Sequence, residues 1–342
     1  MTELREQPHK RWNPLAKRWV LVSPHRTQRP WQGHTETIST GSGEPYDPAC
    51  YLCPGNARAN GGSNPAYTGT HVFDNDFAAL RPGDPPFQYE DGLLRAAGER
   101  GLSRVLIYSP DHSLTMRRMT QPQALAVIAM WRAQFADIER IDWVRSIMIF
   151  ENRGAMMGAS NPHPHGQLWA NESVPDEIAI EAAAQEEFFL QHTETLLSRY
   201  VAQELRARER IVVENDHFVA LVPFWAVWPF ETMIVPKRAY GAIVDQTPEE
   251  DAALAAILRE LTARYDNVFD TPFPYSMGLH QRPVNDASKP GWHFHMHFYP
   301  PLLRSATVRK FLVGYELMAW PQRDITAEAA AKHLREVRGI AG

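Results

Sequence analysis

Five short segments of this chain occur twice in the same order, and this internal repeat limits the folds that the chain can adopt. The repeat consists of an Asn-Asp segment, an apolar strand, a helix that begins at a threonine, a second strand and a histidine-rich strand. The paired segments are residues 75–80 and 215–221, residues 104–110 and 231–236, the helix starts at Thr120 and Thr247, residues 146–150 and 275–279, and residues 163–167 and 293–297. One pair alone would be noise, but five in the same order predict a duplicated chain.

Each copy of the repeat predicts the order strand, strand, helix, strand, strand. This order predicts an α+β fold in which antiparallel sheets are flanked by helices. We divide the chain into two halves, residues 1–172 and residues 173–342. Between the copies, residues 174–210 are rich in Glu, Ala, Gln and Leu and predict one or two helices. A final Ala-rich helix is expected to begin near Thr326.

The histidine-rich strand of the first half carries two histidines, His163 and His165, separated by one residue. Side chains alternate along an extended strand, so both histidines lie on the same face. Pro162 and Pro164 disfavour a helix and lack a backbone donor, which predicts a stiff edge strand. One histidine could be anchored while the other is held out as a nucleophile.

A histidine pair of this spacing can also be a metal-binding clip or simply a polar strand face. The small residues between Gly154 and Ser160 favour a functional site, because they could form a backbone concavity that binds phosphate. We expect Gly166 to let a bulky substrate approach the backbone. Gln167 lies two residues after His165, so its neutral amide is on the same strand face as the histidines.

The composition is that of an ordinary soluble globular protein, with 342 residues, 44% hydrophobic and 22% charged. The net charge of -5 argues against non-specific nucleic-acid binding, so anionic ligands would need local arginines and lysines. The most apolar stretch, residues 218–230, contains two prolines and is too short to span a bilayer. The first ten residues contain no apolar signal core, and we expect a cytoplasmic protein.

The chain has only two cysteines, Cys50 and Cys53, which excludes a disulfide framework. A thioredoxin-type redox pair would be expected where a strand meets a helix. These cysteines lie instead in a loop rich in Pro, Gly and Asn, which favours a zinc knuckle.

Basic residues follow a short predicted strand at residues 19–23. Arg26 and Arg29 could form an anion-contacting loop, although charge alone favours a solvated basic turn. Near the other end of the chain, residues 302–316 place basic groups beside an apolar strand or helix.

These motifs together resemble the galactose-1-phosphate uridylyltransferase family of the histidine-triad superfamily. The resemblance is carried by Asn-Pro-His-Pro-His-Gly-Gln at residues 161–167, Cys-x-x-Cys at residues 50–53, Ser-Pro-Asp-His at residues 109–112 and the long run at residues 297–311. It covers nearly the whole chain. It implies two histidine-triad-like halves whose antiparallel sheets form a half-barrel-like core flanked by helices.

The resemblance implies a ping-pong enzyme, a nucleotidyltransferase of galactose metabolism. UDP-glucose would give its uridylyl group to His165 and release glucose 1-phosphate, and galactose 1-phosphate would then take the group to form UDP-galactose. A neutral imidazole, with an ordinary pKa of about 6.5, is a good nucleophile near neutral pH. Gln167 stands where the hydrolase branch has a third histidine. An amide supplies no titratable proton, which favours a transferase over a hydrolase.

The resemblance also implies two metal sites. A zinc site would use Cys50, Cys53, His112 and His163. A second site, holding iron or zinc, would use Glu181, His280, His295 and His297. The neighbouring His293 receives no role from the resemblance.

By the same resemblance, substrate contacts fall on two groups of residues, and a homodimer shares its active sites between subunits. The UDP group would contact Arg26, Arg29, Asn75, Asp76, Asn152, Ser160 and Gln167. The hexose phosphate would be reached from the partner subunit by Lys310, Phe311, Val313, Tyr315, Glu316 and Gln322. Two alternatives stay open: another nucleotidyltransferase or phosphorylase of this superfamily that uses an adenine nucleotide, and a non-catalytic zinc-binding protein.

Overall fold

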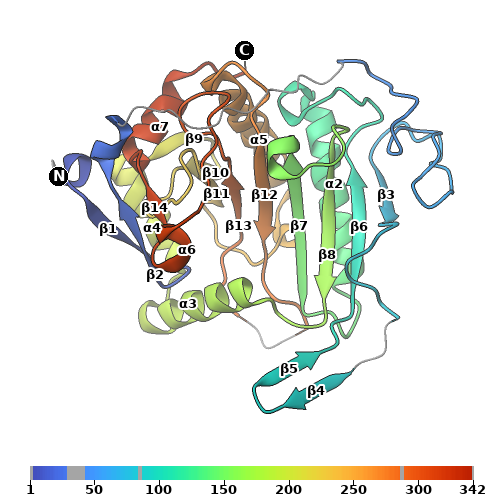
Figure 1. The fold of residues 1–342 in the computed structure, drawn as a ribbon, viewed down its shortest axis with the longest axis horizontal. Helices are drawn as coiled ribbons and strands as arrows, with labels where there is room; N and C mark the ends of the chain where they lie inside the picture. The colour runs from blue at the N-terminus through green and yellow to red at the C-terminus, as the bar shows by residue number, and fades with distance from the viewer. Residues whose placement is uncertain (1–2, 29–42, 84–86, 286–288, 341–342) are drawn as a thin grey trace.

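A nine-stranded antiparallel sheet forms the centre of the computed structural model, which describes residues 3–28, 43–83, 87–285 and 289–340 (Figure 1). In spatial order its strands are β3 (His71–Asp74), β6 (Gly101–Ile107), β8 (His165–Asn171), β7 (Ser146–Arg153), β12 (Tyr275–His280), β13 (His295–Tyr299), β11 (Thr232–Pro236), β10 (Phe218–Leu221) and β9 (Ile211–Glu214). Among the described strands, β3 and β9 are the two edges, so the sheet is open. The predicted α+β class is confirmed.

The strand order shows the duplication directly. From the edge inward, the first half runs β3-β6-β8-β7, and the second half runs β10-β11-β13-β12 after the additional edge strand β9. The two innermost strands, β7 and β12, pair antiparallel with Phe150 opposite Gly278. The halves therefore share one continuous sheet and one large apolar core. The division of the chain at residue 172 stays a prediction.

Two long helices cover one face of the sheet, one from each half (Figure 1). They are α2 (Gln121–Ile138) and α5 (Pro248–Val268), and both begin as predicted. Thr120 and Thr247 each accept a hydrogen bond from the third helical residue and receive the reciprocal capping bond. Buried side chains such as Trp131 and Leu258 fill the space between helices and sheet.

The segment between the repeats forms two helices, α3 (Asp176–His192) and α4 (Leu196–Ala207), as predicted. The last helix, α7 (Ala327–Glu336), begins after Thr326, also as predicted. A small sheet of β1 (His9–Asn13), β2 (Arg18–Val22) and β14 (Gln322–Arg323) joins the two ends of the chain.

The remaining short elements connect these layers. They are α1 (Glu3–Glu6), η1 (Pro24–Gln28), the hairpin of β4 (Gln88–Asp91) and β5 (Leu94–Ala97), η2 (Met116–Arg118), η3 (Ala155–Met157), η4 (Ile243–Asp245) and α6 (Tyr315–Met318). Within the described ranges, no helix has the length and apolar composition that a membrane crossing needs.

The prediction that the His-Pro-His segment is an edge strand was wrong. Strand β8 begins only at His165 and lies between β6 and β7, in the interior of the sheet. Because Pro162 and Pro164 precede the strand, their missing donors cost the ladder nothing. The carbonyl of Pro164 still accepts a hydrogen bond from the amide of Tyr108 at 3.0 Å.

Two further expectations are corrected. A side chain at Gly166 would collide with the phenol of Tyr108, so this glycine accommodates a core tyrosine rather than a substrate. The first strand of the repeat, expected at residues 75–80, does not form there. The strand β3 lies before this segment and ends at Asp74. The chain then follows β6 irregularly, and the amide of Asn75 donates to the carbonyl of Ser103 at 2.8 Å.

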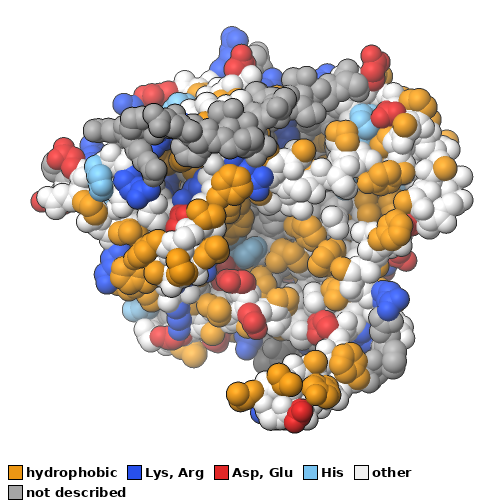
Figure 2. Space-filling model, in the orientation of Figure 1, with side chains coloured by type: hydrophobic (Ala, Val, Ile, Leu, Met, Phe, Trp, Pro, Cys, Tyr) orange, Lys and Arg blue, Asp and Glu red, His pale blue; other side chains and the backbone are white. Residues whose placement is uncertain are grey.

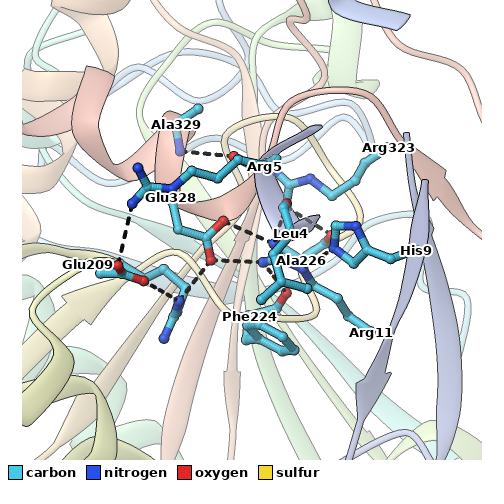
Figure 3. A network of polar contacts seen from close by, with 12 residues as sticks. Leu4, Arg5, His9, Arg11, Glu209, Phe224, Ala226, Arg323, Glu328 and Ala329 are labelled. Atoms are coloured by element: carbon cyan, nitrogen blue, oxygen red, sulfur yellow. Dashed lines mark hydrogen bonds and ion pairs between the residues drawn. The ribbon is translucent and has the colours of Figure 1, made fainter. Parts of the chain in front are cut away.

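Glu328, in the first turn of α7, joins the N-terminal sheet to the second half (Figure 3). Its carboxylate accepts two hydrogen bonds from Arg11, at 2.9 and 3.0 Å, and one from Arg210 at 2.7 Å. The Arg11 side chain is only 1% exposed. Burial alone would raise the pKa of Glu328, but the hydrogen bonds and charges of the two arginines outweigh it and lower this pKa to about 2.

We predict that Glu328→Gln lowers the free energy of unfolding by about 3 kcal/mol at neutral pH, because it leaves the buried Arg11 without its carboxylate partner and removes one of the carboxylates that pair with Arg210. The folded-state pKa lies below the unfolded one, so the carboxylate stabilises the fold above about pH 4.5. That contribution is lost as the pH falls towards about 2. Urea unfolding across this range measures it. The exposed Glu336, paired with Lys332, provides the control Glu336→Gln. Equal effects of both variants would contradict the prediction.

Candidate active site and metal clusters

His165, the first residue of β8, is oriented by the backbone of its neighbouring histidine. Its Nδ1 donates a hydrogen bond to the carbonyl of His163 at 2.6 Å. The proton is therefore fixed on Nδ1, and Nε2 keeps its lone pair for chemistry. Burial lowers the pKa of His165, and the hydrogen bond to His163 opposes this only in part. The ring is thus neutral at physiological pH, as a nucleophile must be.

A cavity of about 360 Å³ opens in front of His165. Its volume lies in the usual range for small-molecule sites. Several predicted residues meet there. The lining consists of Tyr51, Leu52, Ala59, Phe73, Asn75, Asp76, Phe77, Val105, Ser160, His165 and Gln167. The amide oxygen of Gln167 accepts a hydrogen bond from the indole of Trp169 at 3.1 Å, which fixes the orientation of its side chain.

Sequence reasoning missed the aromatic walls of this cavity. Phe73 and Phe77 lie beside the predicted Asn75 and Asp76, and Phe77 is 78% exposed. The guanidinium of Arg58 lies 3.9 Å from the ring centre of Phe73 and also pairs with Asp76. An exposed aromatic directly after an Asn-Asp pair was the available signal, because flat exposed rings are suitable surfaces for stacking a base.

The other predicted nucleotide contacts lie elsewhere. Asn152, on β7, lines a smaller cavity on the other side of His165 and accepts a hydrogen bond from Ser276 at 2.6 Å. Arg26 lies in η1 and pairs with Asp324 at 3.2 Å. Arg29 lies outside the described residues.

Behind His165, four buried side chains converge on one point: Cys50, Cys53, His112 and His163. The Nδ1 atoms of His112 and His163 are 3.3 Å apart, and the thiol of Cys53 lies 3.6 and 3.5 Å from them. Zinc binds nitrogen at about 2.0 Å and sulfur at about 2.3 Å, so a tetrahedral site spaces its ligand atoms roughly 3.3 to 3.8 Å apart. The cluster fits a tetrahedral metal ion.

The protonation states agree with this fit. His163 Nε2 lies 2.8 Å from the carbonyl of Ser109, which can only accept, so Nδ1 is left as the metal-facing lone pair. Burial lowers the pKa of His163 to about 4 and keeps the ring neutral. Burial also raises the pKa of Cys53 to about 11 when no cation is present. A bound divalent cation would reverse this effect and stabilise the thiolates.

A second cluster consists of Glu181 on α3, His280 at the end of β12, and His295 and His297 on β13. The Glu181 carboxylate lies 2.8 Å from His280, 3.5 Å from His295 and 3.9 Å from His297. Burial would raise the pKa of Glu181, but the neighbouring His280 and His295 and the hydrogen bond from His280 hold it well below the ordinary value.

Unsatisfied nitrogen atoms favour a metal at this second cluster. His295 Nε2 and both ring nitrogens of His297 are buried and have no hydrogen-bond partner. Buried polar atoms without a partner are costly, and a metal ion would satisfy two of these at once. Three imidazoles and one carboxylate suit zinc or iron.

The predicted hexose-binding residues gather in one segment away from this cavity. Lys310 donates to the Glu316 carboxylate at 2.5 Å and to the carbonyl of Gln322 at 2.6 Å. The amide of Val313 donates to Glu316 at 3.2 Å. Phe311 and Tyr315 are half exposed. None of the predicted hexose-binding residues is among the described residues that line the cavity in front of His165.

Comparison with known proteins identifies the family. A profile described as "Galactose-1-phosphate uridyl transferase, N-terminal domain" matches residues 1–175, and one described as the C-terminal domain matches residues 181–341. The chain belongs to the galactose-1-phosphate uridylyltransferase family. A galactose-1-phosphate uridylyltransferase of Haemophilus influenzae is 50% identical, covering 98% of this chain and 96% of the relative. That of Saccharomyces cerevisiae is 46% identical, covering 97% and 94%.

Solved structures agree with this family assignment. One described as "Structure of uridylyltransferase" has a TM-score of 0.76 and 27% identity, covering 95% of this chain and 97% of that chain. An ADP-glucose phosphorylase from Arabidopsis thaliana also has a TM-score of 0.76, with 22% identity, covering 97% and 100%. At that identity the second likeness concerns the fold alone.

We predict that His163→Asn and His165→Gly separate metal binding from chemistry. His163→Asn should lose the metal of the cysteine cluster and much of the thermal stability, since a closed structural site contributes directly to folding. His165→Gly should keep its metal and fold while losing activity. Elemental analysis and thermal unfolding of both variants check this. Equal metal content would contradict the assignment of these neighbours to different tasks.

Proposed function

We propose that this protein is a nucleotidyltransferase that moves a uridylyl group between UDP-glucose and galactose 1-phosphate. The observation that carries the proposal is the neutral His165, whose Nδ1 is bonded to the His163 carbonyl and whose Nε2 is available beside a nucleotide-sized cavity. The family supports the substrates, because its members at 42 to 50% identity bear the name galactose-1-phosphate uridylyltransferase.

The reaction proceeds in two displacements. Nε2 of His165 attacks the α-phosphorus of UDP-glucose, and the bond from that phosphorus to the bridging oxygen breaks, which releases glucose 1-phosphate. A phosphate oxygen of galactose 1-phosphate then attacks the same phosphorus, and the nitrogen–phosphorus bond breaks to give UDP-galactose. His165 returns unchanged and Nδ1 keeps its proton throughout, because the His163 carbonyl holds it.

Gln167 contributes a neutral donor to the phosphoryl group. Its amide oxygen is held by Trp169, so its NH₂ group is the part left for a phosphoryl oxygen. An amide at this position cannot act as a general acid or base, and the intermediate therefore waits for a sugar phosphate instead of being hydrolysed. Asn75, Asp76, Asn152, Ser160 and the arginines at 26 and 29 would contact the UDP group.

The metals have structural parts in this proposal. A zinc ion held by the two cysteines, His112 and His163 would fix the backbone that orients His165. Iron or zinc held by Glu181, His280, His295 and His297 would fix α3 against β12 and β13 in the same way. The predicted cytoplasmic location remains part of the proposal.

We predict that UDP-glucose alone leaves one uridylyl group on His165. Galactose 1-phosphate should discharge it rapidly and water only slowly, because Gln167 offers no proton. Intact-protein mass spectrometry and peptide mapping measure the adduct, with His165→Gly as the control and ADP-glucose as the competing donor. An adduct on His295, or no adduct at all, would contradict the double displacement. An adduct formed equally well from ADP-glucose would favour the adenine-nucleotide alternative.

The hexose phosphate is proposed to meet residues from a partner subunit of a homodimer. Figure 2 shows apolar side chains gathered over the α6 region. The segment exposes Phe311, Val313, Tyr315, Leu317, Met318 and Trp320. A contiguous exposed apolar segment is typical of a protein–protein contact. Because these residues lie away from the cavity of their own chain, a two-fold dimer could bring them to the cavity of the other.

Complementation tests this shared site. Chains carrying His165→Gly are mixed with chains carrying Gln322→Ala under conditions of verified subunit exchange. We predict that about a quarter of wild-type activity returns, since half of the dimers are mixed and each mixed dimer has one intact site of two. Activity that stays at background after exchange would place the whole site in one chain.

A further inference from the structure

His293 occupies in the second half the place that His163 occupies in the first. Each lies two residues before the histidine that begins the equivalent strand, β13 or β8. His163 Nε2 donates to the carbonyl of Ser109 at 2.8 Å, and His293 Nε2 donates to that of Pro236 at 3.0 Å. Pro236 is the last residue of β11, and Ser109 lies two residues after the end of the equivalent strand β6.

The backbone of each histidine serves the same purpose. The His163 carbonyl accepts from Nδ1 of His165 at 2.6 Å, and the His293 carbonyl accepts from Nδ1 of His295 at 2.8 Å. In both halves this bond directs Nε2 of the second histidine away from the carbonyl that accepts from Nδ1. In the first half Nε2 faces the cavity, and in the second half it faces the Glu181 carboxylate at 3.5 Å.

The two halves differ in what holds the first histidine. Nδ1 of His163 faces the cysteine cluster, whereas Nδ1 of His293 lies 2.8 Å from the hydroxyl of Thr195. Because the Pro236 carbonyl takes the Nε2 proton, Nδ1 of the neutral His293 ring accepts from a pair of hydroxyls, Thr195 at 2.8 Å and Ser198 at 3.4 Å, whose oxygens are bonded to each other at 2.7 Å. His293 is fully buried and Thr195 is 6% exposed, so water does not compete for this bond.

Thr195 is itself fixed, because it is the N-cap of α4. It accepts a hydrogen bond from the amide of Ser198 at 3.2 Å. The amide of His293 donates to the side chain of Gln185 at 2.9 Å, and Gln185 lies on α3 together with Glu181. Helix α3 thus supplies one ligand of the second cluster, and α3 and the N-cap of α4 together hold His293, whose carbonyl orients the ligand His295.

We propose that Thr195 and His293 are positioning residues of the second metal cluster, in which a helix-cap hydroxyl takes the place that the cysteine cluster has in the first half. Thr195 holds the His293 ring, and His293 holds the His295 ring in the tautomer that presents Nε2 to the metal. Hydrogen-bonded partners of metal ligands are generally worth 10- to 100-fold in metal affinity. This inference rests on the metal proposed for the second cluster.

The test compares Thr195→Val, Thr195→Ser and Thr326→Val. Thr326 is a matched control, because it caps α7 with the same 3.2 Å bond and is 7% exposed, yet lies on another helix. Metal release is followed against chelator concentration by elemental analysis. Cys50 and Cys53 are the only cysteines in the sequence, so thiol reactivity reports the first cluster alone. Glu181→Gln identifies the release step of the second cluster.

We expect Thr195→Val to release the second-cluster metal at a chelator concentration up to about 10-fold lower while its thiols stay protected, because Thr195 acts on the ligand through His293 and not directly. Thr195→Ser, which keeps the hydroxyl, should behave as wild type. Thr326→Val should lower the melting temperature without changing metal release. Equal release from Thr195→Val and Thr326→Val would overturn the positioning role. Wild-type protein that contains only the metal of the cysteine cluster would instead overturn the second metal itself.

Discussion

The hydrogen bond from Nδ1 of His165 to the carbonyl of His163 is the interaction on which the chemistry of this fold depends. It fixes the proton on Nδ1 and presents Nε2 to the cavity. The bond forms only while the His165 ring and the His163 carbonyl keep their relative positions. The converging side chains of Cys50, Cys53 and His112 provide that constraint by holding His163 from behind. A metal ion there would organise a catalytic group without touching a substrate.

Duplication gives this hydrogen bond a second use. The same histidine turn begins β8 and β13, and the two strands lie in corresponding positions of one continuous sheet. In the first half the oriented Nε2 belongs to the proposed nucleophile, and in the second half it belongs to a residue of the proposed metal site. The residue two positions further along each strand lies on the same face and differs between the halves. It is Gln167 beside the cavity and His297 in the second cluster. One backbone geometry therefore supports reactivity or metal binding, depending on which side chains surround it.

Charge is distributed so that binding requires more than one segment of the chain. The described residues that line the cavity in front of His165 include no lysine or arginine. Lys310, a natural partner for a sugar phosphate, is neutralised by Glu316 in its own chain. A doubly charged ligand would therefore have to compete with Glu316 for Lys310 or draw on cations from other segments.

The sequence by itself determined the duplication, the starts of the long helices at Thr120 and Thr247, and the Cys-x-x-Cys pair, because these are local or periodic signals. The resemblance to the family supplied both ligand sets, and the structure brings each set together. Tertiary structure decided that β8 is an interior strand, that β7 and β12 join the halves, and that Thr195 holds His293. These contacts link residues far apart in the chain. No local pattern records them, because hydrogen-bond partners such as Thr195 and His293 meet only when α4 packs against the sheet.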